Sequence, residues 1–264
     1  MESLDRLSPG RRPPGAAAGY QSWRDLTFIH WRLPAEAIRP LLPPELTLDL
    51  WEGDAWVALV PFDMQRVRPW WSPVVPGVSW FHETNLRTYV LFRGEKPGVW
   101  FFSLEASNTI AVLAARWGWM LNYYRTDLIL ERRGDSRCYS GRRRWPRPVP
   151  ATYDLTTTIG SPINTPGGSE QDKPGVATPG TLEHFLAERY YLYTTDGRGR
   201  LYRAQVHHPP YPLRHATVKI EQESILAAAG INCPGSPDHV LFSPGVDVEV
   251  FSLERVATAS PVAG

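Results

Sequence analysis

The stretch from residue 80 to residue 90 carries the side chains with the clearest chemical potential. An acid, an amide, a guanidinium group and a phenol recur at every second position, as Glu83, Asn85, Arg87 and Tyr89. Because side chains alternate between the two faces of a β-strand, this spacing places all four on one face. Such a row can line a ligand-binding pocket, and it can equally face water. The residues alone leave both interpretations open.

Glu83 is a candidate catalytic residue. Burial of its carboxyl group in apolar surroundings would raise its pKa towards neutrality, where the group can act as a general acid or base. Trp80, Trp100 and Phe102 could supply these surroundings, and Trp100 and Phe102 are also candidate ligand contacts. The alternative is a carboxylate that pairs with an arginine for structural reasons.

Arg87 is a candidate catalytic residue that would hold an anion, because its planar donors suit a carboxylate bidentately. A strand rises about 3.3 Å per residue, so Glu83 and Arg87 are about 13 Å apart along it and do not pair directly. Asn85 lies between them, where it could share a small carbonyl or carboxylate compound with either neighbour. The alternative for Arg87 is a structural ion pair with one of three acids, Glu105, Asp127 or Glu188.

Two adjacent tyrosines begin a further predicted strand, Tyr123 and Tyr124. One of them is expected to face inward and to donate a hydrogen bond to a carbonyl oxygen. We assign Tyr124 a catalytic role and Tyr123 a ligand-binding role. Packing is the alternative for both, since tyrosine at a strand start often only fills space.

Three histidines, His30, His207 and His208, are candidate hydrogen-bonding or proton-transfer groups in the pocket. His207 and His208 are adjacent, so on a strand they point to opposite faces, and the sequence does not say which faces inward. The histidine spacing matches no known set of metal ligands. No metal and no other cofactor is therefore predicted.

Composition narrows the class of protein. The chain has 264 residues, 42% of them hydrophobic and 11 of them Trp, which indicates one globular domain. A net charge of +1, from 28 basic and 27 acidic residues, gives no general attraction to nucleic acid or to an anionic membrane. With two cysteines and no apolar leader or spanning segment, a cytoplasmic location is expected. A small molecule is the expected partner, and self-association is left open.

The pattern of short apolar runs and turn residues predicts a mainly β chain with a few short helices. Strands are predicted at residues 26–33, 46–50, 56–64, 80–90, 98–105, 123–131, 188–193, 201–208, 217–222 and 246–253. Short helices are predicted at residues 35–42, 107–118 and 224–229 and after Thr181.

Segments of unusual composition punctuate this pattern. Residues 1–19 are predicted to be a disordered tail, residues 20–256 a single domain, and residues 257–264 a loose C-terminus. Residues 160–180 are rich in Gly, Pro, Ser and Thr, which predicts a flexible insertion or a mobile lid. Arginines concentrated at 132–147 could bind phosphate or RNA, but a solvated edge strand is favoured.

Five segments resemble the YqjF-like family of uncharacterised proteins, which is similar to the acetoacetate decarboxylase-like superfamily. They are Phe28–Pro34 with Leu41–Pro44, Glu83–Val90, Val99–Leu104, Glu188–Tyr190 and His207–Leu213. The resemblance runs from about residue 22 to residue 254. It implies an antiparallel β-barrel with an internal pocket, into which the row at 83–89 would point. It also matches Glu83 to a strand-borne glutamate of the decarboxylase site.

The resemblance fails at the residues that define the decarboxylase reaction. Where those enzymes carry a pair of lysines after a helix, this chain has Tyr123 and Tyr124, and none of Lys96, Lys173 and Lys219 lies nearby. A Schiff base needs a primary amine, so classical decarboxylation is not expected. The sequence favours acid–base chemistry of dehydratase, cyclase, isomerase or lyase type on a carbonyl or carboxylate compound. A non-catalytic barrel that binds a small apolar or acidic metabolite is the alternative.

Overall fold

A computed structural model of the chain describes residues 4–110, 112, 121–146, 150–164, 175–196, 198–232 and 235–256. In this part of the chain β-strands predominate and the helices are short, as the sequence predicts. The strands are β1 (Gly19–Leu33), β2 (Leu46–Leu48), β3 (Ala55–Pro69), β4 (Phe81–Phe92), β5 (Glu95–Ala106), β6 (Tyr123–Arg133), β7 (Ser136–Trp145), β8 (Thr152–Pro162), β9 (Tyr191–Thr195), β10 (Leu201–His207), β11 (Arg214–Glu223), β12 (His239–Val250) and β13 (Glu254–Arg255). The helices are η1 (Ser8–Gly10), α1 (Ala35–Ile38), η2 (Arg39–Leu41), α3 (Leu182–Ala187) and α4 (Ile225–Ala228).

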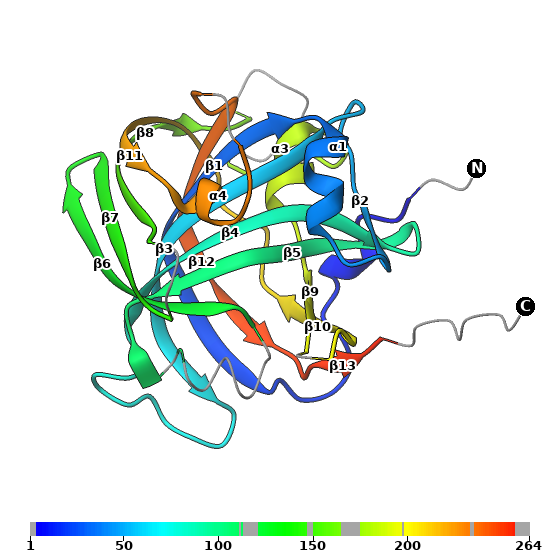
Figure 1. Cartoon of the computed structure of the whole chain (residues 1–264). Coiled ribbons are helices and arrows are strands. Elements are labelled where there is room, and N and C mark those ends of the chain that lie inside the picture. Colours follow the sequence, from blue (N-terminus) through cyan, green and yellow to red (C-terminus); the bar gives the residue numbers. More distant parts are fainter. Residues whose placement is uncertain are drawn as a thin grey trace, which may run out of the picture.

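The strands form one sheet that closes into a ring (Figure 1). Strands β12, β1, β3, β4, β5, β9 and β10 pair in this order, and β10 then pairs with β12. A second route leaves β5 through β6, β7, β8 and β11 and returns to β12. The pairings of β5 with β6 and with β9 are parallel, and the others in the two routes are antiparallel.

Local sequence explains several element boundaries. The side chain of Thr181 caps α3 by accepting a hydrogen bond from the backbone N–H of His184 at 3.4 Å. Pro34 precedes α1, where its fixed φ suits a helix start. Strands β9 and β10 pair as the predicted hairpin. Most of the helix expected at 107–118 lies outside the described residues, as do residues 165–174 of the insertion expected at 160–180. In the described remainder of that insertion, residues 160–162 belong to β8, and Ile163 and Ala177 are buried.

The apolar core is divided between two faces of the sheet. One cluster lies on the face that carries Phe28, Phe62 and Tyr89, and a second lies on the opposite face with Ile29 and Leu86. The side chains of β4 on the second face, at 84, 86, 88 and 90, are also buried. Strand β4 is thus covered on both faces, which makes it the centre of the fold.

The arginine-rich strand β7 is not an edge strand, so that prediction was wrong. It pairs with β6 on one side and with β8 on the other. Its hairpin with β6 is held to the sheet by Arg132 and Arg137, whose Nε atoms donate to Asp25 at 2.7 and 2.6 Å. Arg132 also donates to Asp63 at 2.9 Å. These arginines therefore serve to attach the hairpin.

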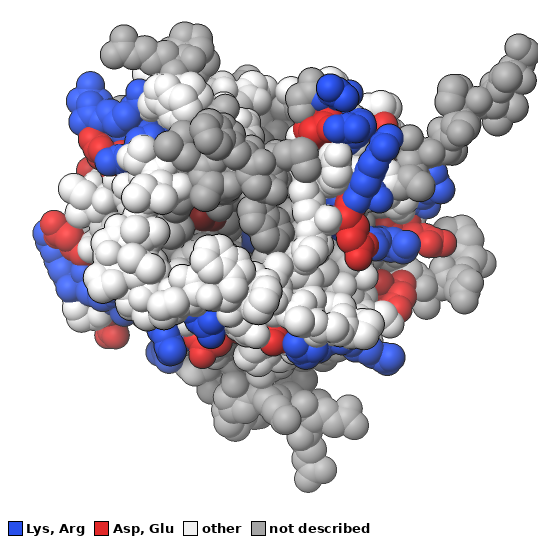
Figure 2. Space-filling view, turned by 90° about the horizontal axis from the view of Figure 1, so that it is seen from below, with Lys and Arg blue, Asp and Glu red and all other residues white. Residues whose placement is uncertain are grey.

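The surface shows no field of one sign on the face seen in Figure 2. Basic and acidic side chains alternate around its margin, and the described residues of its middle carry few charges. Within the described ranges, no helix has both the length and the apolar character needed to cross a membrane.

Candidate functional site

The polar row of β4 is buried inside the fold. Glu83 is 4% exposed, Asn85 6%, Arg87 8% and Tyr89 0%. Strand β4 is not an edge strand, because it pairs with β3 on one side and with β5 on the other. The apolar cluster that contains Phe28 and Phe62 covers the polar row. The solvated interpretation is therefore excluded, and each polar group must find a partner within the fold or in a ligand.

Glu83 receives a hydrogen bond from the Tyr123 hydroxyl, which donates to Oε2 at 2.8 Å. Burial raises the pKa of Glu83 to about 7, an effect that the hydrogen bond from Tyr123 partly offsets. The apolar surroundings come from its cross-strand neighbours Phe62 and Ala106. Burial, together with the charge of Glu83, holds the pKa of Tyr123 well above its usual value, so Tyr123 remains a proton donor in this pair.

Arg87 is surrounded by aromatic side chains. Its guanidinium carbon lies 5.5 Å from the ring centroid of Phe28. Nε and Nη2 are buried and have no hydrogen-bond partner among the described residues. The three acids proposed as structural partners have other contacts: Glu105 pairs with Arg143, Asp127 with Arg144, and Glu188 with Tyr190. Within the described part of the chain, Nε and Nη2 of Arg87 thus have no acidic partner and could bind an anion.

Asn85 lies between these two groups on the same face of β4, and its Oδ1 is also buried without a partner among the described residues. Tyr89 follows Arg87 on this face. Its hydroxyl donates to the Leu186 carbonyl at 2.9 Å and lies 3.0 Å from Nε2 of His30. His30 is fully buried, and this burial lowers its pKa well below the usual value, so the imidazole is neutral.

The structure separates the two adjacent histidines. His208 is 2% exposed and its ring lies 4.7 Å from that of Tyr190 and 4.5 Å from that of Tyr211. His207 is partly buried and its Nδ1 lies 3.1 Å from the carbonyl oxygen of Gly10, in the N-terminal segment. Of the two, His208 belongs to the group around Arg87.

Three of the predicted residues lie elsewhere. The ring of Tyr124 stacks on the guanidinium group of Arg143, and its centroid lies 3.7 Å from the guanidinium carbon. Tyr124 is on the face of β6 opposite to Tyr123. Trp100 and Phe102 pack into clusters separate from the one that contains Tyr89. The structure therefore brings Tyr123 to Glu83 and leaves Tyr124, Trp100 and Phe102 apart from them.

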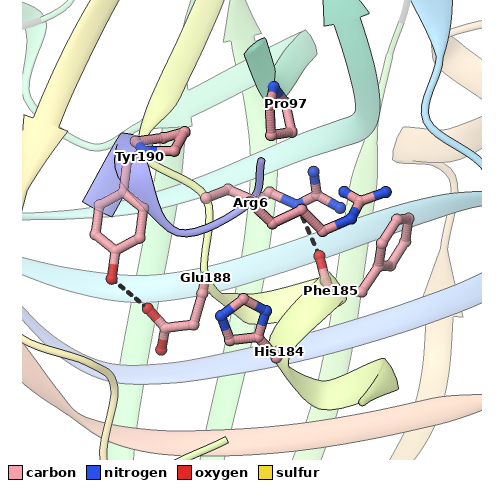
Figure 3. A pocket seen from close by; sticks show the side chains of 8 residues that line it. Arg6, Pro97, His184, Phe185, Glu188 and Tyr190 are labelled. Atoms are coloured by element: carbon pink, nitrogen blue, oxygen red, sulfur yellow. Dashed lines mark hydrogen bonds between the residues drawn. The ribbon is translucent and has the colours of Figure 1, made fainter. Parts of the chain in front are cut away.

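The sequence reasoning assigned no role to Glu188 beyond an ion pair. This carboxylate is 7% exposed, accepts from the Tyr190 hydroxyl at 2.6 Å and accepts from the Tyr211 backbone N–H at 2.9 Å. Burial raises its pKa. Figure 3 shows Glu188 and Tyr190 at the wall of a small pocket whose other side includes Arg6 of the N-terminal segment. The run Glu188–Tyr190 was the only sequence signal, as part of a family motif.

Ligands for a metal ion are not grouped in the described part of the chain. No cluster of three or more His, Cys, Asp or Glu side chains within it could hold one. The two described lysines, Lys96 and Lys219, are exposed, so neither supplies an amine to the interior.

Solved structures with the same fold include an enzyme complexed with pyruvate and an acetoacetate decarboxylase. The chain superposes on an enduracididine biosynthesis enzyme, MppR, complexed with pyruvate, with a TM-score of 0.61, 13% identity, and coverage of 95% of this chain and 93% of that one. It superposes on acetoacetate decarboxylase from Legionella pneumophila with a TM-score of 0.59, 12% identity, and coverage of 97% and 98%. It also superposes on an acetoacetate decarboxylase-like enzyme from Sphingomonas wittichii RW1, with a TM-score of 0.60, 13% identity, and coverage of 92% of this chain and 95% of that one. These likenesses show the acetoacetate decarboxylase-like fold.

Sequence comparison gives the family. The protein YqjF of Bacillus subtilis (strain 168), described as uncharacterized, is 36% identical over 245 residues, which are 92% of this chain and 94% of that protein. The model of the DUF2071 family, described as an uncharacterized conserved protein, matches residues 20–247. The YqjF-like resemblance is thus confirmed, and the chain belongs to the DUF2071 family.

Proposed function

We propose that this protein is an enzyme that acts on a small carbonyl or carboxylate compound by acid–base chemistry without a covalent lysine intermediate. One observation carries the proposal: a single buried strand face holds both Glu83, with a pKa of about 7, and Arg87, with buried donors that have no partner among the described residues. A carboxyl group with this pKa exchanges protons readily at neutral pH. A buried cation without a protein counter-charge favours an anionic ligand.

The chemistry follows from the positions of these groups. Glu83 would take a proton from the substrate or return one, while Tyr123 holds its carboxyl group in place. Arg87 would bind a carboxylate or stabilise negative charge that develops on a carbonyl oxygen. Asn85, between them on β4, would contact the middle of the substrate. Dehydration, cyclisation, isomerisation and lyase steps all use such an arrangement.

The comparison structures support the class of substrate. The MppR structure contains pyruvate, and the decarboxylase is named for a small oxo acid. In this chain, however, Glu83 accepts a hydrogen bond from Tyr123, and the described lysines are exposed. A reaction through a Schiff base therefore has no supporting residue in the described interior.

The test is a screen of small oxo and hydroxy acids for turnover, followed by variants of the two central residues. Glu83→Gln should lower kcat by two to three orders of magnitude, and Arg87→Met should lower kcat/KM by a similar factor, as removal of one preorganised group typically does. Arg142→Met is the matched control, because Arg142 is exposed. Full activity in Glu83→Gln would overturn the acid–base assignment.

A second function is favoured by the aromatic surroundings of Arg87, which suit a non-catalytic barrel for a small acidic metabolite. Native mass spectrometry distinguishes the two. A co-purified acid that stays bound and unchanged in both the wild-type protein and Glu83→Gln, but is lost in Arg87→Met, would identify a binding protein.

A further inference from the structure

The protonation state of His208 follows from its contacts. Its Nδ1 lies 2.8 Å from the carbonyl oxygen of Pro209. A carbonyl oxygen can only accept a hydrogen bond, so Nδ1 carries the proton. Burial lowers the pKa of His208 to about 4, so the ring carries only this one proton at neutral pH.

The other ring nitrogen is therefore a hydrogen-bond acceptor. Nε2 of His208 is buried and has no hydrogen-bond partner among the described residues. The rings of Tyr190 and Tyr211 pack against the imidazole and fix its orientation. A buried acceptor without a donor is costly, so a donor from a ligand would be favoured at this position.

His208 and Arg87 border the same group of aromatic rings. Phe28 contacts both sides: its ring is 5.3 Å from that of Tyr211, which contacts His208, and 5.5 Å from the guanidinium carbon of Arg87. The charge of Arg87 also adds to the effect of burial in lowering the pKa of His208. The donors of Arg87 and the acceptor Nε2 of His208 thus lie in one buried region.

We propose that the ligand of this site is a small anion that carries its own hydrogen-bond donor, as a hydroxy carboxylate does. Its carboxylate binds Arg87 and its hydroxyl donates to Nε2 of His208, while Oδ1 of Asn85 is a second acceptor on the same face. This inference rests on the proposed function, because it uses the same anion-binding residue. An oxo acid without a hydroxyl group offers only acceptors and would leave Nε2 of His208 unpaired.

The experiment measures the affinity of the whole chain for three matched pairs of acids by titration calorimetry. The pairs are lactate and propanoate, 2-hydroxyhexanoate and hexanoate, and 3-phenyllactate and 3-phenylpropanoate, so that the size of the ligand is tested as well. Within the pair that fits the site, the hydroxy acid should bind at least about tenfold more tightly, the effect of one additional buried hydrogen bond.

Variants assign this preference to His208. His208→Phe should abolish the preference and retain binding of the acid without the hydroxyl group, whereas His208→Gln, which still offers an acceptor, should keep part of it. His207→Phe is the matched control, because His207 contacts the N-terminal segment. Circular dichroism checks that each variant folds, and the Gln variant remains informative if the Phe variant does not fold.

The possible results separate the two proposals. Equal affinity within every pair, with all binding lost in Arg87→Met, would overturn the hydroxy-acid inference and leave the anion-binding role of Arg87 standing. A preference unchanged in His208→Phe would also overturn it. If none of the six acids binds, the anion-binding role of Arg87 fails, and this inference fails with it.

Discussion

At the scale of single residues, the site consists of polar groups that the fold buries at a cost. Glu83 retains one hydrogen bond, from Tyr123, and its pKa rises to about 7 because burial disfavours the charged form. Arg87 has buried donors without partners among the described residues, in aromatic surroundings. A buried carboxyl group with a raised pKa and a buried arginine with unpaired donors are rare at purely structural positions, and they are common in ligand-binding sites.

The raised pKa of Glu83 predicts a specific dependence of stability on pH. Between about pH 4.5 and pH 7 the folded protein holds a proton on Glu83 that the unfolded chain has lost, so the free energy of unfolding falls as the pH rises through this window. The loss amounts to as much as about 3 kcal/mol, at 1.36 kcal/mol per pKa unit. In Glu83→Gln this contribution should vanish.

Urea unfolding of both proteins at pH 4.5, 5.5, 6.5 and 7.5 measures it. The difference between wild type and Glu83→Gln removes the contribution of other titrating groups. If the two curves run parallel over this range, the pKa of Glu83 is not raised.

At the scale of elements, β4 is buried on both faces, so its surroundings depend on how strands β6, β7, β8 and β11 are attached to the rest of the sheet. A buried ion pair joins β5 to β7. Arg143 donates from Nη2 to Oε1 of Glu105 at 2.5 Å and from Nε to Oε2 at 3.1 Å, and Thr126 donates to Oε2 at 2.6 Å. Glu105 is 0% exposed, so its charge depends on these donors.

Arg143→Met should lower the free energy of unfolding by about 3–5 kcal/mol, because it leaves the buried charge of Glu105 without a counter-charge. Arg144→Met is the matched control on the same strand. Arg144 pairs with Asp127, and both are about half exposed, so its loss should cost less than about 1 kcal/mol. Urea unfolding measures both variants, and equal effects would show that the Glu105 pair is no more important than a surface pair.

At the scale of the whole molecule, the N-terminal segment, residues 4–18, lies against the ring, although its composition predicts a loose tail. Arg6 pairs with Asp49, which also pairs with the buried Arg189. The backbone carbonyl of Pro9 accepts from Gln205 at 2.8 Å. At Gly10 an added Cβ would lie 2.9 Å from the Tyr190 ring, so a larger residue would require that ring to shift. Specific contacts thus order a segment that has little apolar surface.

Deletion of residues 1–12 should therefore destabilise the protein. The lost contacts of Arg6, Pro9 and Gly10 are worth about 1–2 kcal/mol together, which corresponds to a fall in Tm of roughly 2–8 °C for a protein of this size. Differential scanning calorimetry measures this shift. Arg11→Met, at an exposed position of the same segment, should leave Tm unchanged. An unchanged Tm in the truncated protein would contradict the view that the segment is part of the folded structure.

The sequence by itself determined which residues share a face. The period of two along residues 83–89 places four polar groups together, and local turn and cap residues specify the hairpin of β9 and β10 and the start of α3. These features depend on neighbours within a few residues, so the sequence pattern reports them directly.

Only the tertiary structure decided which face turns inward and which partners meet. The choice of Tyr123 over Tyr124 depends on the parallel pairing of β6 with β5, where Tyr123 lies opposite Leu104. Tertiary contacts also decide that His208, and not His207, lies among the aromatic rings near Arg87. They decide as well that β7 pairs with a strand on each side. A shift of one residue in strand pairing exchanges the two faces, and this register is set by contacts between segments far apart in the chain, which no local pattern encodes.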